Sequence, residues 1–257
     1  MGNFSYLKYT DNKGSASATS ITASTEATAY PSSNLKVLPI AKHWRSTGVT
    51  SENLQLDLGS AMAIDLFGIV NHNLTSSATI TINGGSSANP GGGEYTTTIA
   101  WREFDAFKLL AAAQTWRYWK FIFADTTNSD GYIRIGCLLL GDSTELTFHW
   151  QYGSSFRDSF VNTAKRSGGG VPYYEAIYGL RSQVFHFGPL TVSEMAVLRT
   201  LYRSLQGSAN PLFVIPESQT NDGYFGRFVN DLDRKLDYQE SCDLEFEEDG
   251  RGRDITA

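Results

Sequence analysis

The sequence predicts a mainly β protein, with an N-terminal antiparallel β-sandwich followed by a second β-rich domain that contains one α-helix. Short segments in which apolar and polar residues alternate recur along the chain, and a period of two is typical of half-buried strands. Glycine-rich turn signals separate these segments, as at Asn83-Gly84-Gly85. Hydrophobic residues make up 41% of the 257 residues, which is enough to form a core and excludes wholesale disorder.

The first 33 residues show no clear strand pattern. Serine, threonine and alanine dominate from Ser15 to Ser33, so this stretch has few side chains to bury. We expect residues 1–33 to form an extended arm or an irregular edge. The sandwich is then expected over residues 34–143, and the second domain over residues 144–257.

The strands of the sandwich follow in order. Asn53 to Leu58 alternates strictly, with the leucines on one face, and Gly59 ends the pattern. Ile64 to Val70 is a nearly continuous apolar run, and its length and composition favour a buried strand over a helix. Further strands are expected at 78–82, 116–123 and 132–140. Short strands at regular spacing, with turns between them, indicate an antiparallel sandwich.

The second domain combines strands with a helix at 191–206. Thr191 and Glu194 have the spacing of a capping box, in which each side chain binds the other residue's backbone amide. The apolar residues that follow share one helical face, and Gly207 is placed to end the helix. This face consists of Met195, Leu198, Tyr202 and Leu205.

The last expected strand, from Ser241 to Glu247, alternates apolar and acidic residues, so the acidic side chains should share the face opposite the core. The net charge is −6, and residues 217–257 contain twelve acidic and five basic residues, so the rest of the chain is nearly neutral. An acidic face of this kind suits a basic partner protein, although a merely solvated face is the alternative. The candidates for this assembly interface are Asp243, Glu245 and Glu247.

The sequence contains no catalytic or cofactor motif. No GxSxG or phosphate-binding loop is present, and no histidine or cysteine pair has metal-ligand spacing, so we expect no enzyme, no cofactor and no metal. A pair of glycosidase carboxylates stays open, because their separation in space decides that activity. The absence of basic runs argues against nucleic acid, and no apolar run is long enough for a membrane helix or a secretory signal. Cys137 and Cys242 are expected to be buried free thiols.

Several segments stand in the order typical of discoidin-like (galactose-binding-like) domains. They are Ser33-Asn34-Leu35, Trp44-Arg45-Ser46, Leu54-Gln55-Leu56-Asp57-Leu58-Gly59, Ile69-Val70-Asn71-His72-Asn73-Leu74, Arg117-Tyr118-Trp119-Lys120-Phe121, and Tyr132-Ile133-Arg134-Ile135 through Leu140-Gly141. Residues 34–141 therefore resemble this family, which implies a jelly-roll β-sandwich that often binds sugars through loops at one end. No cysteine flanks the domain, unlike family members with a disulfide between their ends, and this fits synthesis in the cytosol.

The second half resembles the β-rich module of siphophage tail-tip proteins. The resemblance is carried by Phe187-Gly188-Pro189-Leu190-Thr191 with Glu194, by Asn210-Pro211-Leu212-Phe213-Val214-Ile215-Pro216, and by Cys242-Asp243-Leu244-Glu245-Phe246-Glu247-Glu248. It implies a distal-tail or baseplate subunit that forms a homo-oligomeric ring between the tail tube and the tip hub. Such a protein is made in the host cytoplasm and resides in the virion.

Two classes of function follow. The first is a structural virion protein, and the alternative is a carbohydrate-binding module for a cell-surface glycan. A glycan site needs an aromatic stacking face and a few polar groups that fix the orientation of the sugar. The alternatives for the candidates are that Trp44 fills the core and that His72 and Asn73 hold a turn. The glycan candidates are Trp44, Arg45, His72 and Asn73.

Overall fold

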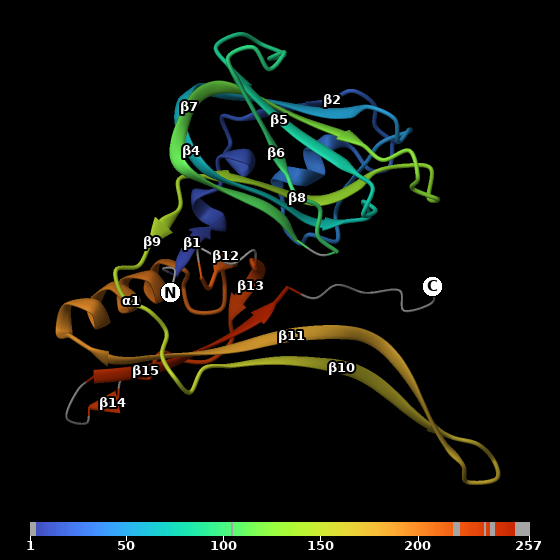
Figure 1. Cartoon of the computed structure of the whole chain (residues 1–257). Helices are drawn as coiled ribbons and strands as arrows, with labels where there is room; N and C mark the ends of the chain where they lie inside the picture. The colour runs from blue at the N-terminus through green and yellow to red at the C-terminus, as the bar shows by residue number, and fades with distance from the viewer. Residues whose placement is uncertain (1–3, 104, 218–221, 234, 237–239, 250–257) are drawn as a thin grey trace. The chain divides into compact units, whose positions relative to one another are not determined.

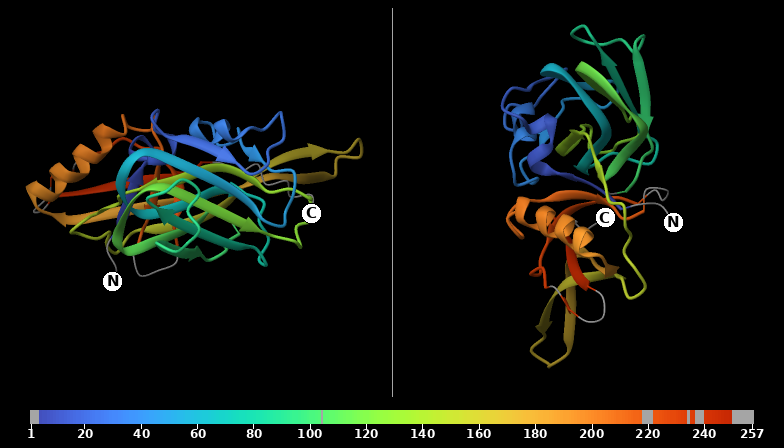
Figure 2. Two further views of the ribbon diagram at one scale, coloured as in Figure 1. Left: turned by 90° about the horizontal axis from the view of Figure 1, so that it is seen from above. Right: turned by 90° about the vertical axis from the view of Figure 1, so that its left-hand side faces the viewer.

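The structure, a computed structural model, describes residues 4–103, 105–217, 222–233, 235–236 and 240–249. The chain divides into two compact units. The sandwich unit comprises Tyr9–Thr144, and the helix-bearing unit comprises Met1–Lys8 together with Glu145–Ala257. Both units are built mainly from antiparallel strands, as Figures 1 and 2 show, which confirms the predicted fold class.

The sandwich unit holds a sheet with the strand order β3-β8-β4-β7-β5-β6, in which β2 also pairs with β4. Three short 3₁₀ helices, Tyr9–Asp11, Lys13–Ser15 and Ser32–Lys36, lie along the chain before β3. The strands are β2 (Ser20–Ala23), β3 (Trp44–Arg45), β4 (Glu52–His72), β5 (Thr79–Gly85), β6 (Tyr95–Ile99), β7 (Ala106–Ala124) and β8 (Arg134–Gly141).

Two long strands, β4 and β7, turn this sheet into a two-layered sandwich. Residues 52–57 of β4 pair with the end of β7, and residues 54–57 also pair with β2, whereas residues 66–72 of the same strand pair with β8. The register of β4 against β7 shifts between these two parts, where Gly59 has a positive φ of 81°. Glycine adopts this left-handed conformation without steric cost, so the strand bends here and enters the second layer.

The core of the sandwich consists of the alternating residues that the sequence indicated. Leu54, Leu56 and Leu58 are at most 1% exposed, and Gln55 and Asp57 between them face outward. Phe67, from the second part of β4, meets the rings of two β7 residues across the sandwich. Its ring centre lies 4.9 Å from that of Trp119 and 6.1 Å from that of Phe121. The two layers therefore share one closely packed aromatic interior.

The N-terminal segment, predicted as an extended arm or an irregular edge over residues 1–33, contains two short strands that belong to different sheets. Strand β1 (Ser5–Lys8) is buried in the sheet of the helix-bearing unit, whereas β2 belongs to the sandwich. Between them, the Asn12 side chain donates to the Leu138 carbonyl and accepts from the Leu140 amide, each at 2.9 Å. Backbone pairing in the two strands and the buried side-chain amide of Asn12 hold this stretch in place, although it contains few apolar residues.

The helix-bearing unit holds the other sheet, with the strand order β10-β11-β15-β13-β12-β1-β9 and β14 beside β15. The first strand of the chain, β1, and the last, β15, belong to the same sheet. They are connected through two strands between them, because β1 pairs with β12, β12 with β13, and β13 with β15. Its remaining strands are β9 (Thr144–Glu145), β10 (Ser155–Arg166), β11 (Pro172–Leu190), β12 (Leu212–Ile215), β13 (Tyr224–Phe228), β14 (Lys235–Leu236) and β15 (Glu240–Glu248).

Helix α1 (Val192–Ser204) is the single α-helix of the described residues, and it forms where the sequence predicts it. Its capping box is complete, since Thr191 accepts from the Glu194 amide and Glu194 accepts from the Thr191 amide. Of the expected apolar face, Tyr202 is only partly buried, and its hydroxyl donates to the Asn230 carbonyl. No helix of the described residues is long and apolar enough to cross a membrane. The residues of α1 that enter the core are Met195, Leu198 and Leu201, followed by Leu205 at the C-cap.

The hairpin of β10 and β11 extends beyond the rest of its sheet (Figure 1). Residues 182–190 of β11 pair with β15, but residues 172–181 pair, within the described part of the chain, with β10 alone. β10 itself is the edge strand of the sheet. The structure therefore contains a two-stranded ribbon, which exposes Tyr173 and, in its turn, Val171. Phe156 is exposed to a similar degree but lies at the start of the edge strand β10, opposite Gln183, where β15 is also part of the sheet.

Candidate ligand-binding end of the sandwich

Three loops of the sandwich unit meet at one end of its strands. The Asp125 amide donates to the Val49 carbonyl at 2.7 Å, and the Asn128 side chain donates to the Asn73 carbonyl at 3.0 Å. These bonds tie the loops to one another, so the end has a fixed shape. The loops are 46–51, 73–78 and 125–133.

The structure brings the four predicted glycan residues together at this end. Two of them pair with the same residue, since Trp44 of β3 and His72 of β4 both lie opposite Ile135 of β8. Arg45 lies opposite Arg134, and the Asn73 amide donates to the Arg134 carbonyl. The segments of β3 and β4 that carry these residues therefore lie on either side of β8.

Trp44 and His72 are nevertheless not available to a ligand. Trp44 has no exposed surface, and its indole donates to the Thr25 carbonyl at 3.2 Å. His72 is 7% exposed, and its Nδ1 accepts from the Leu74 amide at 3.2 Å. The prediction that these two residues contact a glycan is therefore wrong. Trp44 fills the core and His72 holds the turn after β4, because a buried side chain cannot reach a ligand in solvent.

Asn73 is only partly exposed, and the chain itself uses its hydrogen-bonding groups. Its side-chain amide nitrogen donates to the Asp130 carboxylate at 2.7 Å and to the Tyr132 carbonyl at 3.0 Å. Its oxygen accepts from the Arg134 amide at 2.7 Å. Asn73 therefore positions the loop that carries Asp130, which is exposed, and Tyr132, which is partly exposed.

Arg45 is the predicted residue that remains accessible. Its guanidinium carbon lies 3.5 Å from the centre of the Tyr132 ring, which is a close cation–π stack. Beside it, the rings of Tyr30 and His43 stack with centres 4.5 Å apart and planes 12° apart. The Arg45 amide donates to the Tyr30 carbonyl at 3.1 Å, so the two stacked pairs are neighbours.

The sequence analysis missed Tyr30, His43, Asp130 and Tyr132 as members of this end. A signal was present, because Tyr30 precedes Pro31 and Tyr132 follows Gly131, and aromatic residues at turns have few ways to be buried. The arrangement offers flat faces, one cation and one exposed carboxylate. It can stack on the C–H face of a sugar ring and bond its hydroxyl groups.

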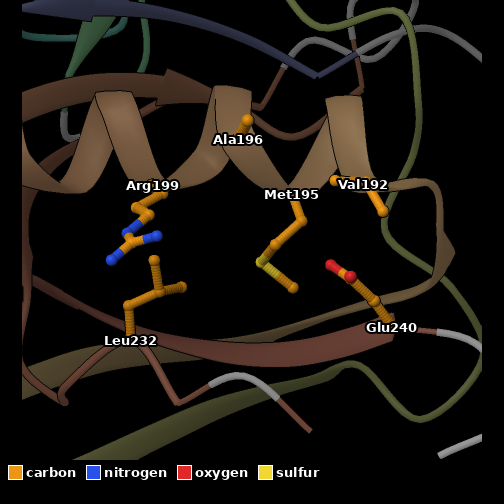
Figure 3. A pocket seen from close by; sticks show the side chains of 6 residues that line it. All are labelled: Val192, Met195, Ala196, Arg199, Leu232 and Glu240. Atoms are coloured by element: carbon orange, nitrogen blue, oxygen red, sulfur yellow. The ribbon is translucent and has the colours of Figure 1, made fainter. Parts of the chain in front are cut away.

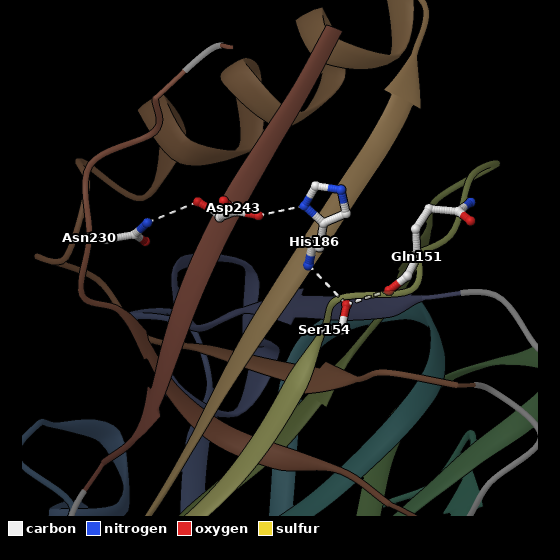
Figure 4. Close-up of polar contacts among 5 residues, drawn as sticks. All are labelled: Gln151, Ser154, His186, Asn230 and Asp243. Carbon is white, nitrogen blue, oxygen red and sulfur yellow. Dashed lines mark hydrogen bonds and ion pairs between the residues drawn. The ribbon is translucent and has the colours of Figure 1, made fainter. Parts of the chain in front are cut away.

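A second polar cluster, in the helix-bearing unit, contains the residue types of a catalytic triad (Figure 4). His186 Nδ1 lies 2.6 Å from an oxygen of Asp243. The Ser154 hydroxyl accepts from the His186 backbone amide and donates to the Gln151 carbonyl, each at 2.9 Å. In a catalytic triad the serine hydroxyl bonds the imidazole ring of the histidine, whereas here it bonds the histidine backbone. These contacts therefore connect a turn to two strands and do not form a triad.

The acidic assembly candidates alternate along β15 with buried residues, as expected for a strand. Asp243, Glu245 and Glu247 are each partly exposed. They are accompanied by basic groups, since Asp243 contacts His186 and Glu247 lies opposite Arg227 in the register of β13. The face is thus less purely negative than the sequence suggests.

A recess of about 290 Å³ lies beneath α1 (Figure 3). The side chains of Arg199 and Glu240 lie on opposite sides of Met195 in it. Its lining residues are Val192, Met195, Ala196, Arg199, Leu232 and Glu240. In the described part of the chain, no group of three or more histidine, cysteine, aspartate or glutamate residues is arranged to hold a metal ion.

No protein-family model matches the sequence, and no curated protein does. Solved structures do align with about half of the chain. Chitosan-binding module 1 of a chitosanase/glucanase from Paenibacillus sp. IK-5 is 17% identical, with 51% of this chain and 98% of that chain covered and a TM-score of 0.42. The family 32 carbohydrate-binding module of Clostridium perfringens NanJ, solved with galactose, is 15% identical, with 55% and 99% covered and a TM-score of 0.40.

A third structure is the lectin domain of lectinolysin, solved with Lewis B antigen. It is 10% identical, with 51% of this chain and 97% of that chain covered and a TM-score of 0.41. Because these scores are low, the sandwich architecture rests on the strand order and register given above.

Proposed function

We propose that this chain is a non-enzymatic carbohydrate-binding protein whose sandwich unit recognises a glycan with its loop end. The observation that carries the proposal is the pair of neighbouring stacks, Arg45 on Tyr132 and Tyr30 on His43. Partly exposed aromatic faces beside a guanidinium and the Asp130 carboxylate match the needs of a sugar ring, which has an apolar C–H face and hydroxyl groups at its edge.

Binding of glycans to the full chain tests this proposal. A glycan array identifies the ligand, and calorimetry then compares wild type with Tyr132→Ala and Tyr30→Ala. Loss of one stacking ring should weaken binding roughly tenfold, since such contacts contribute on the order of 1 kcal/mol. Tyr152→Ala is the matched control, because Tyr152 is fully exposed in the other unit. Equal affinity in all three variants, or no glycan bound by wild type, contradicts the proposal.

A second candidate function is self-assembly through the helix-bearing unit, and a specific observation favours it. A two-stranded ribbon is marginally stable in water by itself, and an edge strand is a template for pairing with another chain. The β10–β11 hairpin has both properties: Tyr173 in its two-stranded part is 51% exposed, and Phe156 at the start of the edge strand β10 is 53% exposed. A second copy that covers the ribbon would remove this exposure.

In its finer form, this candidate is the subunit of a homo-oligomeric ring in a phage tail tip, in contact with tail tube and hub proteins. Light scattering on the chain, alone and with a tail tube protein, tests it. Oligomers that depend on Phe156 and Tyr173 support the candidate, and Phe156→Ser with Tyr173→Ser should dissociate them. A wild-type chain that stays monomeric both alone and with the tube protein contradicts it.

A further inference from the structure

A second polar recess lies on the outer face of the sandwich, where β2, β4 and β7 run side by side. In the strand register Ser20 lies opposite Asp57, and Asp57 lies opposite Tyr118. Thr22 lies opposite Gln55 in the same way. Side chains alternate along strands, and the residues between these ones face the core, so these five side chains share the outer face. The recess that they line has a volume of about 210 Å³.

The loop between β5 and β6 forms the other wall of this recess with Ala88, Asn89 and Pro90. The wall is fastened to the sheet, because Lys120 donates to the Asn89 side-chain oxygen at 2.7 Å. The Asn83 side chain likewise donates to the Pro90 carbonyl at 3.3 Å. Asn89 has a φ of 59°, a conformation that few residues other than glycine adopt.

The loop can lie this close only because Gly85 is a glycine. A Cβ atom there would stand 2.9 Å from the Cβ of Pro90 and 2.5 Å from an oxygen of Glu94. Glu94 in turn accepts from the Ser86 amide at 3.0 Å and from its hydroxyl at 2.6 Å, which closes the turn. The wall is therefore built by specific contacts, and the recess is a defined feature of the fold.

The groups inside the recess are suited to a neutral ligand with many hydroxyl groups. The hydroxyl groups of Ser20, Thr22 and Tyr118 have no hydrogen-bond partner among the described residues, so they are free to donate and accept. The Asp57 carboxylate is bonded by Arg117 at 2.7 and 2.9 Å, and this ion pair balances its charge. The Arg117 hydrogen bond, followed by that of the Gly59 amide, holds the pKa of Asp57 below its usual value, so the carboxylate is an acceptor at neutral pH.

We propose that this recess is a second carbohydrate subsite, which holds one sugar ring of a neutral glycan. The Tyr118 ring and the Gln55 amide are its principal contacts, with the Asp57 carboxylate as an acceptor for hydroxyl groups. The volume is below the roughly 300 Å³ at which pockets for drug-sized ligands begin, so it suits a single ring. The proposal takes its ligand class from the proposed function and rests on it in that respect.

The test uses the full chain labelled for NMR and titrated with galactose, N-acetylglucosamine and fucose in turn. Backbone amide shifts map each binding site separately. With at least one of these sugars, we expect shifts in residues 20–22, 55–57 and 88–90, in addition to those at the loop end. Gln55→Ala should weaken the recess site roughly tenfold and leave the loop-end shifts unchanged.

Gln114→Ala is the matched control, since Gln114 also lies on the sandwich and makes a single side-chain bond at 3.4 Å, as Gln55 does. Shifts confined to the loop end overturn the recess and leave the proposed function standing. Shifts confined to the recess support it and overturn the proposed loop-end site. Shifts in neither region overturn both. If Gln55→Ala and Gln114→Ala change sugar binding at the recess equally, the proposed subsite is also contradicted.

Discussion

The two units are built from the same kind of alternating strand but use it differently. In the sandwich unit, β4 and β7 each pass from one layer to the other and pair with each other in both layers, and each also pairs with a further strand. In the helix-bearing unit, residues 172–181 of β11 and their partners in β10 extend beyond the sheet and pair only with each other within the described part of the chain. The first arrangement yields a rigid scaffold that presents loops, and the second leaves an edge that another chain can cover.

The largest effect should come from the interior that joins the two layers of the sandwich. Phe67→Ala should lower the free energy of unfolding by about 3–5 kcal/mol, since Phe67 is fully buried between the layers. Phe156→Ala is the same chemical change at a ring that is 53% exposed, and it should cost about 1 kcal/mol or less. Denaturant unfolding measures both. If the two variants lower the free energy of unfolding by similar amounts, the contrast between the two units is wrong.

A somewhat smaller effect is expected where the helix covers its sheet. Leu198→Ala should destabilise the helix-bearing unit by roughly 2–5 kcal/mol, because Leu198 has no exposed surface. Its neighbour Val197 is 44% exposed, so Val197→Ala should change stability by less than about 0.5 kcal/mol. Unfolding followed by fluorescence separates these values. A cost below about 0.5 kcal/mol for Leu198→Ala would place that helical face in solvent.

The acidic face of β15 provides a test of the assembly role. Replacing Asp243, Glu245 and Glu247 by Asn, Gln and Gln should leave the fold intact and slow association with partner subunits, most clearly at low salt. Because Asp243 contacts His186, the single change Asp243→Asn should be compared with the triple variant. Light scattering measures the association rates of wild type and both variants. A wild-type rate for the triple variant at low salt means that the face is merely solvated.

The smallest effects concern one carboxylate in each unit. Arg117 holds the pKa of Asp57 below its usual value of 3.8, and the Thr191 backbone amide does the same for Glu194 relative to 4.5. A lowered pKa in the folded state adds stability that is fully present above the unfolded value and is lost as the pH falls through the folded value. Asp57→Asn and Glu194→Gln should therefore reduce stability near neutral pH.

The difference between each of these variants and wild type should shrink towards zero in acid. Stability measured between neutral pH and about pH 2 shows the trend. Salt should reduce the effect of Asp57→Asn, because that ion pair is exposed to solvent. Glu194 bonds the backbone of its own helix cap, so the effect of Glu194→Gln should be less sensitive to salt. Parallel pH curves for variant and wild type would contradict the assignment.

Local patterns in the sequence by themselves determined the elements and their buried faces. Leu54, Leu56 and Leu58 alternate because successive side chains of a strand point to opposite sides, and the capping box at Thr191 is complete within four residues. The mainly β class and the position of α1 follow from such local rules. The sequence also named Arg45 and Asn73 as candidates on the condition that their segments converge, and it could not show by itself that this condition is met.

Only the tertiary structure decided what distant residues do together. Trp44 and His72 are buried where their strands pair with Ile135, a residue far from both in the sequence, and no local pattern contains that pairing. The stack of Arg45 on Tyr132 and the recess between β2 and the loop of Asn89 likewise join segments far apart in the sequence. Side-chain exposure is set by what packs above a residue, so the sequence could indicate candidate residues, while the fold selected those that reach a ligand.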